Sequence, residues 1–159
     1  YNVPGRTGMD IETETTLSLS KHRNIIGIKE AKADMQRVSR LTKIKDFTVL
    51  SGDDDSFLEA MKLGADGVIS VAANIRPKAT KDICTAIQLG DTNLAEELNN
   101  NLLDTFQLMS AEPNPGPVKS LLMSANIIGP GIRKPLTAMK LSEQSHQNLI
   151  AKTIEEYTS

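Results

Sequence analysis

Residues 24–29 read Asn-Ile-Ile-Gly-Ile-Lys, an apolar run of β-favouring residues that ends in a lysine. Two later runs, residues 47–52 and 67–71, have the same character, and a helix-like stretch follows each of the three. Their apolar character is nearly continuous, which is typical of strands buried on both faces in a parallel sheet that helices cover. The order of the elements therefore predicts a parallel α/β architecture, either doubly wound or a barrel.

The stretches between these runs carry helix signals of their own. Apolar residues recur every three to four positions in residues 35–42 and again in residues 57–63. Ser56 and Glu59 have the spacing of a capping box before the second helix, and Gly64 is placed to end it. These signals support an alternation of strands and helices.

The chain changes character after about Lys78, because no further strand signal follows. We predict only helices there: residues 80–89, a longer helix from about Thr92 that Pro113 ends, residues 118–125, and a last helix after Ser142. The last helix is expected to turn four side chains inward, namely Leu149, Ile150, Ile154 and Tyr157. Helices that follow an alternation of strands and helices indicate a small helical domain at the end of the chain.

Composition and charge exclude several classes of function. The 159 residues carry a formal net charge of −2 and 3% aromatic residues, which gives no surface for nucleic acid or an anionic membrane. No apolar run approaches the roughly 20 residues that span a bilayer, and no signal-peptide layout begins the chain. Cys84 is the only cysteine, so an internal disulfide is impossible and a reducing compartment fits. We expect a cytoplasmic protein.

The sequence also gives no support for a bound cofactor or metal. A glycine-rich phosphate loop with the required spacing follows none of the predicted strands, which disfavours NAD and ATP. His22 and His146 have no partner at metal-ligand spacing, and Cys84 lies in a helical apolar stripe typical of core. We therefore expect chemistry that side chains perform alone.

Lys29 is the most informative candidate for such chemistry. It ends an apolar strand, and active sites in parallel α/β folds lie at the carboxyl ends of strands. Partial desolvation there favours the neutral amine, which is the nucleophile that imine formation requires. The alternative is a lysine whose ammonium extends from the strand end into solvent.

Other candidates lie in two loops. Gly52 follows the second strand and can let a ligand approach the backbone. Asp54 and Asp55 are interpreted as N-caps or helix-dipole partners of the following helix rather than as catalytic acids. In the first loop, the Tyr1 phenol can relay a proton and the Arg6 guanidinium can hold a carboxylate. The alternative for Tyr1 and Arg6 is a role as surface loop residues.

Five segments of the chain, in order, resemble the dihydrodipicolinate synthase family of class I pyruvate aldolases, within the N-acetylneuraminate lyase superfamily. They are residues 1–8 (YNVPGRTG), 25–31 (IIGIKEA), 50–54 (LSGDD), 67–71 (GVISV) and 112–119 (EPNPGPVK). The resemblance covers the chain, and five ordered matches are far more specific than any one of them.

The resemblance implies a fold and an assembly. It implies a (β/α)₈ TIM barrel of which this chain supplies strands 6–8 and the loop after strand 5, followed by a C-terminal helical domain. The barrel part is expected to cover residues 1–78, and the last barrel helix with the helical domain residues 79–159. Members of the family form homo-oligomers, usually a dimer of dimers. A complete barrel needs about 250 residues, so we expect the N-terminal half of the enzyme as a partner.

The resemblance also implies roles for five residues. Lys29 corresponds to the lysine that forms a Schiff base with pyruvate, and Tyr1 to the tyrosine of a proton relay. Arg6 corresponds to the arginine that receives the carboxylate of the second substrate, L-aspartate 4-semialdehyde. Gly52 and the backbone of Ile69 correspond to positions that line the pyruvate pocket. The implied reaction, a lyase step of lysine and diaminopimelate biosynthesis, needs no metal or organic cofactor.

Two alternatives to this function stay open at the level of the sequence. Related aldolases, such as N-acetylneuraminate lyase and keto-sugar-acid aldolases, use the same barrel and the same lysine. Arg6 favours the synthase over them, because a small carboxylated aldehyde needs a cation there. The second alternative is a catalytically silent fragment that acts only in assembly.

Overall fold

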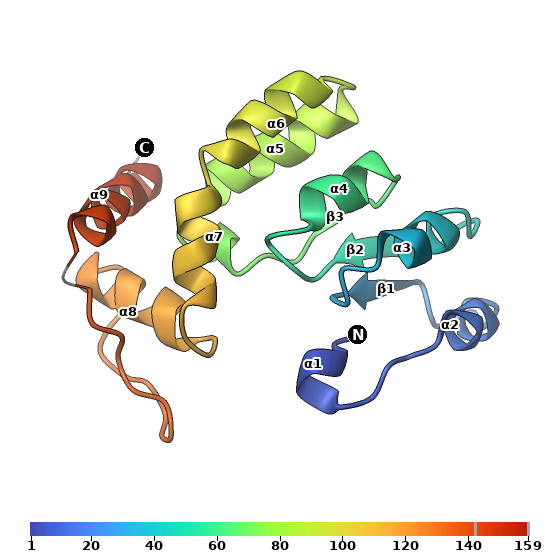
Figure 1. The fold of residues 1–159 in the computed structure, drawn as a ribbon, viewed down its shortest axis with the longest axis horizontal. Helices are drawn as coiled ribbons and strands as arrows, with labels where there is room; N and C mark the ends of the chain where they lie inside the picture. Colours follow the sequence, from blue (N-terminus) through green and yellow to red (C-terminus); the bar gives the residue numbers. More distant parts are fainter. Residues whose placement is uncertain (142, 159) are drawn as a thin grey trace. The chain divides into compact units, whose positions relative to one another are not determined.

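A computed structural model of the chain describes residues 1–141 and 143–158, in which helices alternate with short parallel strands before a run of helices (Figure 1). The elements of the first part are α1 (Pro4–Thr7), α2 (Thr13–Leu19), β1 (Gly27–Glu30), α3 (Met35–Leu41), β2 (Thr48–Ser51), α4 (Phe57–Lys62) and β3 (Gly67–Val68). Those that follow are η1 (Ala72–Asn74), α5 (Pro77–Gln88), α6 (Thr92–Asn100), α7 (Leu103–Ser110), α8 (Gly116–Ser124) and α9 (Gln144–Thr158).

The three strands form one parallel sheet in the order β1-β2-β3, as the sequence predicts. Lys29 pairs with Leu50 and Ser51 with Val68, so the strands are in register at their carboxyl ends. Asn2 forms a parallel bridge to Glu30 and thereby continues the sheet beyond β1. Neighbours in the sheet are thus also neighbours along the chain, which is the order of strands in a βα barrel.

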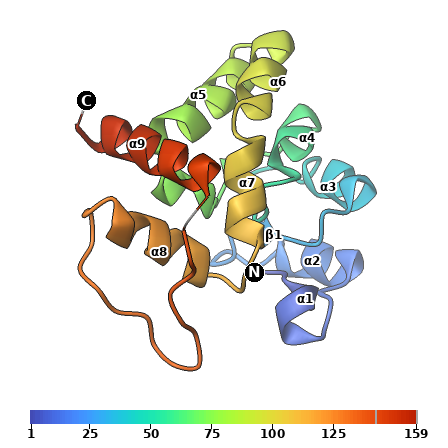
Figure 2. The same ribbon diagram turned by 60° about the vertical axis from the view of Figure 1, so that its left-hand side comes forward.

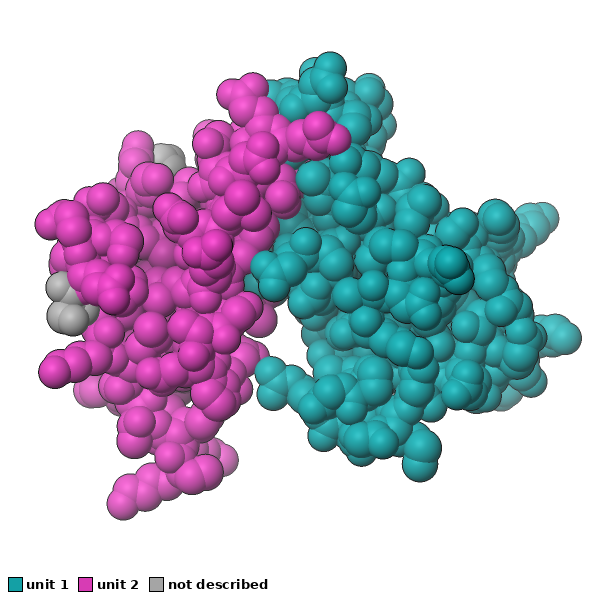
Figure 3. Space-filling model, viewed as in Figure 1, with its two compact units in different colours: residues 1–70, 84–95 teal, residues 71–83, 96–159 magenta. Residues whose placement is uncertain are grey.

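The described residues divide into two compact units, which Figure 3 colours separately. Unit 1 comprises residues 1–70 and 84–95, and unit 2 comprises residues 71–83 and 96–159. Helices α5 and α6 each contribute residues to both units. The boundary at residue 78 that the family resemblance implies stays a prediction.

Unit 1 is built from the sheet and the helices between its strands. Helices α3 and α4 contact each other, and α4 also contacts β2 and β3. Their buried apolar residues form the core, namely Val38, Leu41, Val49, Phe57, Leu58 and Met61. Asp34 caps α3 by accepting a hydrogen bond from the backbone N–H of Arg37 at 3.1 Å.

The start of α4 differs from the predicted capping box. Ser56 occupies the N-cap position, but its side chain makes no capping bond to the helix. Its hydroxyl donates instead to Asp53 Oδ2 at 2.5 Å, a charge-assisted hydrogen bond within the loop before the helix. Gly64 follows the helix with φ of +97°, so the predicted stop is confirmed.

Burial alternates along the strands, against the expectation of strands buried on both faces. In β1, Ile28 and Glu30 are buried while Lys29 is half-buried, and in β2 Val49 is buried while Thr48 is exposed. Successive side chains of a strand point to opposite faces, and within unit 1 the crossover helices cover one of them. Lys29 therefore projects from the less covered face.

Unit 2 consists of helices, with one break that the sequence prediction missed. The long helix expected from Thr92 is two helices, because α6 ends at Asn100 and α7 begins at Leu103. Three consecutive asparagines, residues 99–101, precede the break, and asparagine favours turns over helix interiors. In this part α7 contacts α8, and α8 contacts α9 (Figure 2).

The last helix buries fewer residues than expected. Leu149 is buried in α9, but Ile154 and Tyr157 are exposed, so the predicted inward side is wrong at these two positions. Ser142, the residue after which we expected the helix, lies outside the described residues. Across the described ranges, none of the helices combines the length and the apolar character that crossing a membrane requires.

Candidate active site

The carboxyl ends of the strands bring three of the sequence-predicted residues together in unit 1. Lys29 lies in β1, Gly52 directly follows β2, and Tyr1 precedes the residue that bridges to β1. The backbone N–H of Asn2 donates to the Lys29 carbonyl at 2.9 Å, so Tyr1 is held beside β1. Backbone pairing alone thus brings Tyr1 and Lys29 to the same edge of the sheet.

The Lys29 ammonium lies on the face of the Tyr1 ring. Its Nζ atom is 4.2 Å from the ring centroid, within the range of a cation–π contact. Tyr1 as a whole is 58% exposed, so the pair is accessible to solvent. The amine contacts the face of the ring, so a proton relay between it and the phenol oxygen would run through an intervening water.

Gly52 makes room for the stem of Lys29. A Cβ atom at this position would lie 2.8 Å from Lys29 Cε, 3.0 Å from Lys29 Cγ and 2.9 Å from Ala31 Cβ. Atoms separated by these distances clash, so any side chain at Gly52 would displace the lysine or the backbone beside it. The absence of a side chain at Gly52 therefore decides where the Lys29 stem can lie.

Ile69 and Arg6 are placed less closely. The Ile69 N–H donates to the Ser51 carbonyl at 2.8 Å, which continues the row of strand ends, and its side chain is 47% exposed. Arg6 lies in α1 and is exposed, and its guanidinium makes no hydrogen bond or ion pair with any residue of the ranges 1–141 and 143–158. The structure thus joins Lys29, Tyr1 and Gly52 and leaves Arg6 facing solvent.

In the acidic loop after β2, Asp53 forms hydrogen bonds within the loop. Asp53 accepts the Ser56 hydroxyl, and the Asp53 N–H donates to Ser51 Oγ at 3.3 Å. Ser56 is the N-cap residue of α4, so the N-cap role expected for Asp54 or Asp55 is wrong, whereas a role toward the helix dipole stays a prediction. Partial desolvation raises the pKa of Asp55, and the neighbouring carboxylates raise it further.

Sequence reasoning missed a buried polar cluster behind the strand ends. Asn2, Glu30 and Arg37 are all buried, although each belongs to a polar residue type that is mostly exposed in proteins. The signal was present at Glu30, a carboxylate that directly follows an apolar strand and hence needs a partner. Its partners lie 28 positions earlier and 7 positions later in the chain, which no local pattern reveals.

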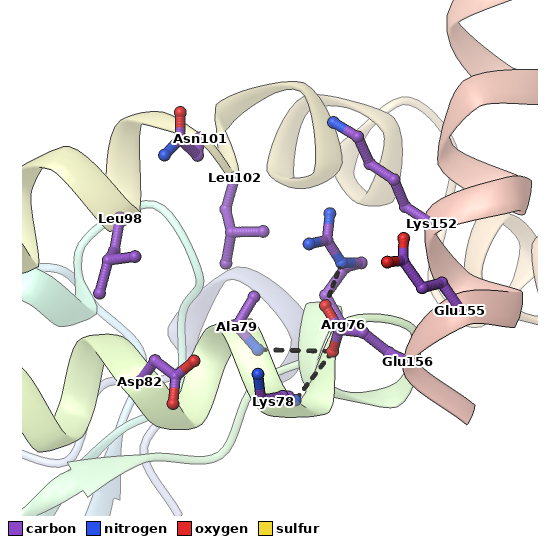
Figure 4. Close-up of a pocket in the computed structure, with 10 residues that line it drawn as sticks. All are labelled: Arg76, Lys78, Ala79, Asp82, Leu98, Asn101, Leu102, Lys152, Glu155 and Glu156. Atoms are coloured by element: carbon purple, nitrogen blue, oxygen red, sulfur yellow. Dashed lines mark hydrogen bonds and ion pairs between the residues drawn. The ribbon is translucent and has the colours of Figure 1, made fainter. Parts of the chain in front are cut away.

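A cavity of about 370 Å³ lies in unit 2, and none of the predicted site residues lines it (Figure 4). Its charged lining comprises three cations and three anions: Arg76, Lys78, Lys152, Asp82, Glu155 and Glu156. These charges balance, and Arg76 is already paired with Glu156 at 2.5 Å. In the part of the chain that the structure describes, no group of three His, Cys, Asp or Glu residues could hold a metal ion.

Comparison with known proteins gives one family. Residues 1–156 match the dihydrodipicolinate synthetase family. The chain is 46% identical over 151 residues to 4-hydroxy-tetrahydrodipicolinate synthase of Pseudomonas aeruginosa, with 94% of this chain and 51% of that protein covered. It is 46% identical over 153 residues to the synthase of Shewanella frigidimarina, with the same coverage.

Solved structures give the same result. The fold matches dihydrodipicolinate synthase of Acinetobacter baumannii, solved in complex with pyruvate, with a TM-score of 0.86 and 41% identity over 96% of this chain and 54% of that one. It also matches the synthase of Methylacidiphilum fumariolicum with a TM-score of 0.88 and 33% identity, covering 99% of this chain and 54% of that one.

The chain spans about half the length of the curated relatives it matches. Its parallel βα array and the helices after it are those of the C-terminal part of a (β/α)₈ barrel and its helical extension, as the sequence predicts. The matched family, the sequence identity and the shared fold agree over nearly the whole chain. The chain belongs to the dihydrodipicolinate synthetase family.

Proposed function

We propose that this chain carries the Schiff-base half of a 4-hydroxy-tetrahydrodipicolinate synthase, in which Lys29 binds pyruvate covalently. The observation that carries the proposal is the arrangement at the strand ends. The Lys29 stem lies against Gly52 and its Nζ lies 4.2 Å from the centroid of the Tyr1 ring. A nucleophile, a proton-transfer group and an open backbone position are the parts that imine formation needs.

The proposed chemistry follows from these three residues. The neutral Lys29 amine attacks the ketone carbon of pyruvate, a C–N bond forms, and the ketone oxygen leaves as water. In this proposal Tyr1 carries the protons between the amine and that oxygen, and the contact of its ring with Nζ supports this role. The imine loses a methyl proton to become an enamine, whose carbon adds to an aldehyde. The amine of the second substrate then displaces Lys29 as the ring closes, which regenerates the lysine.

The second substrate in this proposal is L-aspartate 4-semialdehyde. Arg6 is exposed and unpaired among the described residues, and it lies in the helix that begins three residues after Tyr1. A guanidinium can hold a carboxylate through two parallel hydrogen bonds, so Arg6 is free to bind the substrate's acid group. The names of the relatives support the synthase over N-acetylneuraminate lyase and keto-sugar-acid aldolases, which share the lysine.

Activity in this proposal requires an N-terminal half that completes the barrel, within an enzyme that assembles as a dimer of dimers. The chain covers 51% of the length of the Pseudomonas aeruginosa synthase, and Lys29 is only half-buried in unit 1. A catalytically silent fragment is the second candidate, favoured by the same partial length. The two differ in whether Lys29 reacts.

Borohydride trapping tests the proposal. The full-length protein that contains this chain is incubated with pyruvate, reduced, digested and mapped by mass spectrometry, and the adduct is expected on Lys29. Lys29→Arg keeps the charge but should give no adduct, since the guanidinium is not nucleophilic.

Arg6→Ala should keep the adduct on Lys29. Its rate of turnover with aspartate semialdehyde should fall by at least about tenfold, because a charged hydrogen bond to the substrate is lost.

Each part of the proposal can fail separately. An unmodified Lys29 in the full-length protein contradicts the covalent role. An adduct on Lys29 together with equal loss of imine formation and semialdehyde use in Arg6→Ala contradicts the role of Arg6 alone.

A further inference from the structure

Asn2 and Glu30, the residues that directly follow Tyr1 and Lys29, are joined to each other in the buried interior of unit 1. The Asn2 side-chain amide donates to Glu30 Oε1 at 2.9 Å and lies 3.1 Å from Oε2. Asn2 is 0% exposed and Glu30 is 3% exposed. The two candidate catalytic residues are thus each followed by one half of a buried hydrogen-bonded pair.

Every polar atom of the Asn2 side chain has a partner. Besides Glu30, its Nδ2 donates to Asp10 Oδ1 at 2.8 Å, and its Oδ1 accepts from the Ile11 N–H at 3.0 Å. Its backbone donates to the Lys29 carbonyl and accepts from the Ala31 N–H, both at 2.9 Å. An asparagine held at both its backbone and its amide has no freedom to shift along β1.

Glu30 is anchored from the helix side of the sheet. The Arg37 Nε atom lies 2.5 Å from Glu30 Oε2 as an ion pair, although its N–H is not aligned for a hydrogen bond. The Lys32 N–H donates to Glu30 Oε1 at 2.9 Å, and the Lys32 ammonium donates to Asp10 at 2.6 Å. Lys32, followed by the Asn2 amide, lowers the pKa of Asp10.

The geometry points to Asn2 and Glu30 as positioning residues, which hold Tyr1 over the Lys29 amine by clamping the two strand ends from the opposite face. Successive side chains of a strand point to opposite sides, so the clamp and the reacting groups project from the same backbone in opposite directions. This inference rests on the proposed function, because it assigns a role within the same reaction. A displacement of about 1 Å at a catalytic pair can lower a rate about 10²-fold.

A double-mutant cycle in the full-length protein tests the clamp. Asn2→Ala removes the amide, Tyr1→Phe removes the phenol proton, and the double variant combines them. Asn2→Ala should lower kcat between about 10-fold and 100-fold, with a much smaller change in the KM for pyruvate. If Asn2 acts through Tyr1, the double variant loses little beyond Tyr1→Phe, so the two effects do not multiply.

Thr16→Val is the matched control. Thr16 is 3% exposed and accepts a hydrogen bond from Arg37 Nη2 at 3.2 Å, and among the described residues it makes no hydrogen bond to Asn2 or Glu30. The substitution disturbs the outer end of the same network and should lower the melting temperature while kcat stays within about twofold. If Asn2→Ala prevents folding, Glu30→Gln replaces it in the cycle, because it removes only the charge of the clamp and keeps one acceptor.

The outcomes separate this inference from the proposed function. A pyruvate adduct on Lys29 with a non-additive cycle supports both. An adduct on Lys29 with unchanged kcat in Asn2→Ala, with effects that multiply, or with an equal loss in Thr16→Val overturns the clamp and leaves the Schiff base intact. A full-length protein without any adduct on Lys29 overturns both.

Discussion

Gly52 sets the path of the Lys29 side chain, because the lysine stem occupies the space that a Cβ atom would fill. An added Cβ atom would clash with two neighbours that differ in how easily they can move. Lys29 Cε is near the end of a flexible chain and can move, whereas Ala31 Cβ, at 2.9 Å, is fixed to the backbone. A single methyl group at Gly52 would therefore move the amine from the Tyr1 ring and also push the strand end apart.

Gly52→Ala is expected to slow the trapping of pyruvate on Lys29 by about 10-fold to 100-fold. Gly129→Ala is the matched control, since a Cβ there meets no atom within 4 Å and its φ is not positive. The rate of adduct formation in the full-length protein, followed by quenching with borohydride at set times, measures both. Equal rates in Gly52→Ala and the unaltered protein would show that the stem has another path to the same position.

The residues of the site differ in how far sequence predicts them. Lys29 and Gly52 stand at strand ends, where the rule for parallel sheets places active sites, and the structure brings them together. Tyr1 depended on the family resemblance, because a loop tyrosine has no distinctive pattern. Glu30 could be predicted only as a carboxylate in need of a partner, and Asn2 could not be predicted, because the sequence does not show that the fold buries the two against each other.

At the scale of elements, polar contacts fix the C-terminal turn of α9 within unit 2. Glu156 accepts from the backbone N–H groups of Lys78 and Ala79 at 2.9 and 3.4 Å, at the start of α5, and pairs with Arg76. The Tyr157 hydroxyl donates to the Asn74 carbonyl at 2.7 Å. A carboxylate at a helix N-terminus is favoured by the free N–H groups and the helix dipole. This explains why α9 can dock with Ile154 exposed.

Glu156→Gln is expected to loosen α9 locally. The amide keeps one acceptor oxygen but loses the charge, which should lower the free energy of opening of the helix by about 1–2 kcal/mol. Hydrogen exchange of the α9 amides should then be roughly 5-fold to 30-fold faster. Glu155→Gln is the control, since Glu155 makes no ion pair among the described residues, and its α9 amides should exchange at the original rate. Equal acceleration in both variants would contradict the contact.

Element boundaries show the limit of sequence patterns. The three strands, the stop at Gly64 and most helices are where the apolar spacing and the glycine predict them. The break between α6 and α7 was missed because the leucine spacing continues through it, although the asparagines interrupt the backbone. The inward side of α9 was wrong because Tyr157 and Glu156 bind through polar atoms, which apolar spacing ignores.

For the whole molecule, the chain spans about half the length of the curated relatives it matches. The face that carries Lys29 is half covered in unit 1, and Ile26, before β1, is 75% exposed. An amine in contact with bulk water has a stabilised ammonium form, which is not nucleophilic. In the proposed function, an N-terminal half would exclude water from this face.

The 159-residue chain alone is expected to form the Lys29 adduct about 10-fold to 100-fold more slowly than the full-length protein. Supplying the N-terminal half as a separate polypeptide should restore part of the rate. Circular dichroism verifies that the isolated chain keeps its helices during the measurement. Trapping at the same rate with and without the other half would mean that the residues of this chain suffice.

The parallel sheet has two very short edges. On one side a single residue, Asn2, pairs with β1 within the described part of the chain, and on the other β3 is two residues long. Edge strands this short offer little backbone for a second copy to extend, so the open sheet is a poor template for β-aggregation. A partner would therefore be recognised mainly through the packing of side chains. The rate of assembly would then depend on how fast apolar surfaces come into contact, before any strands pair.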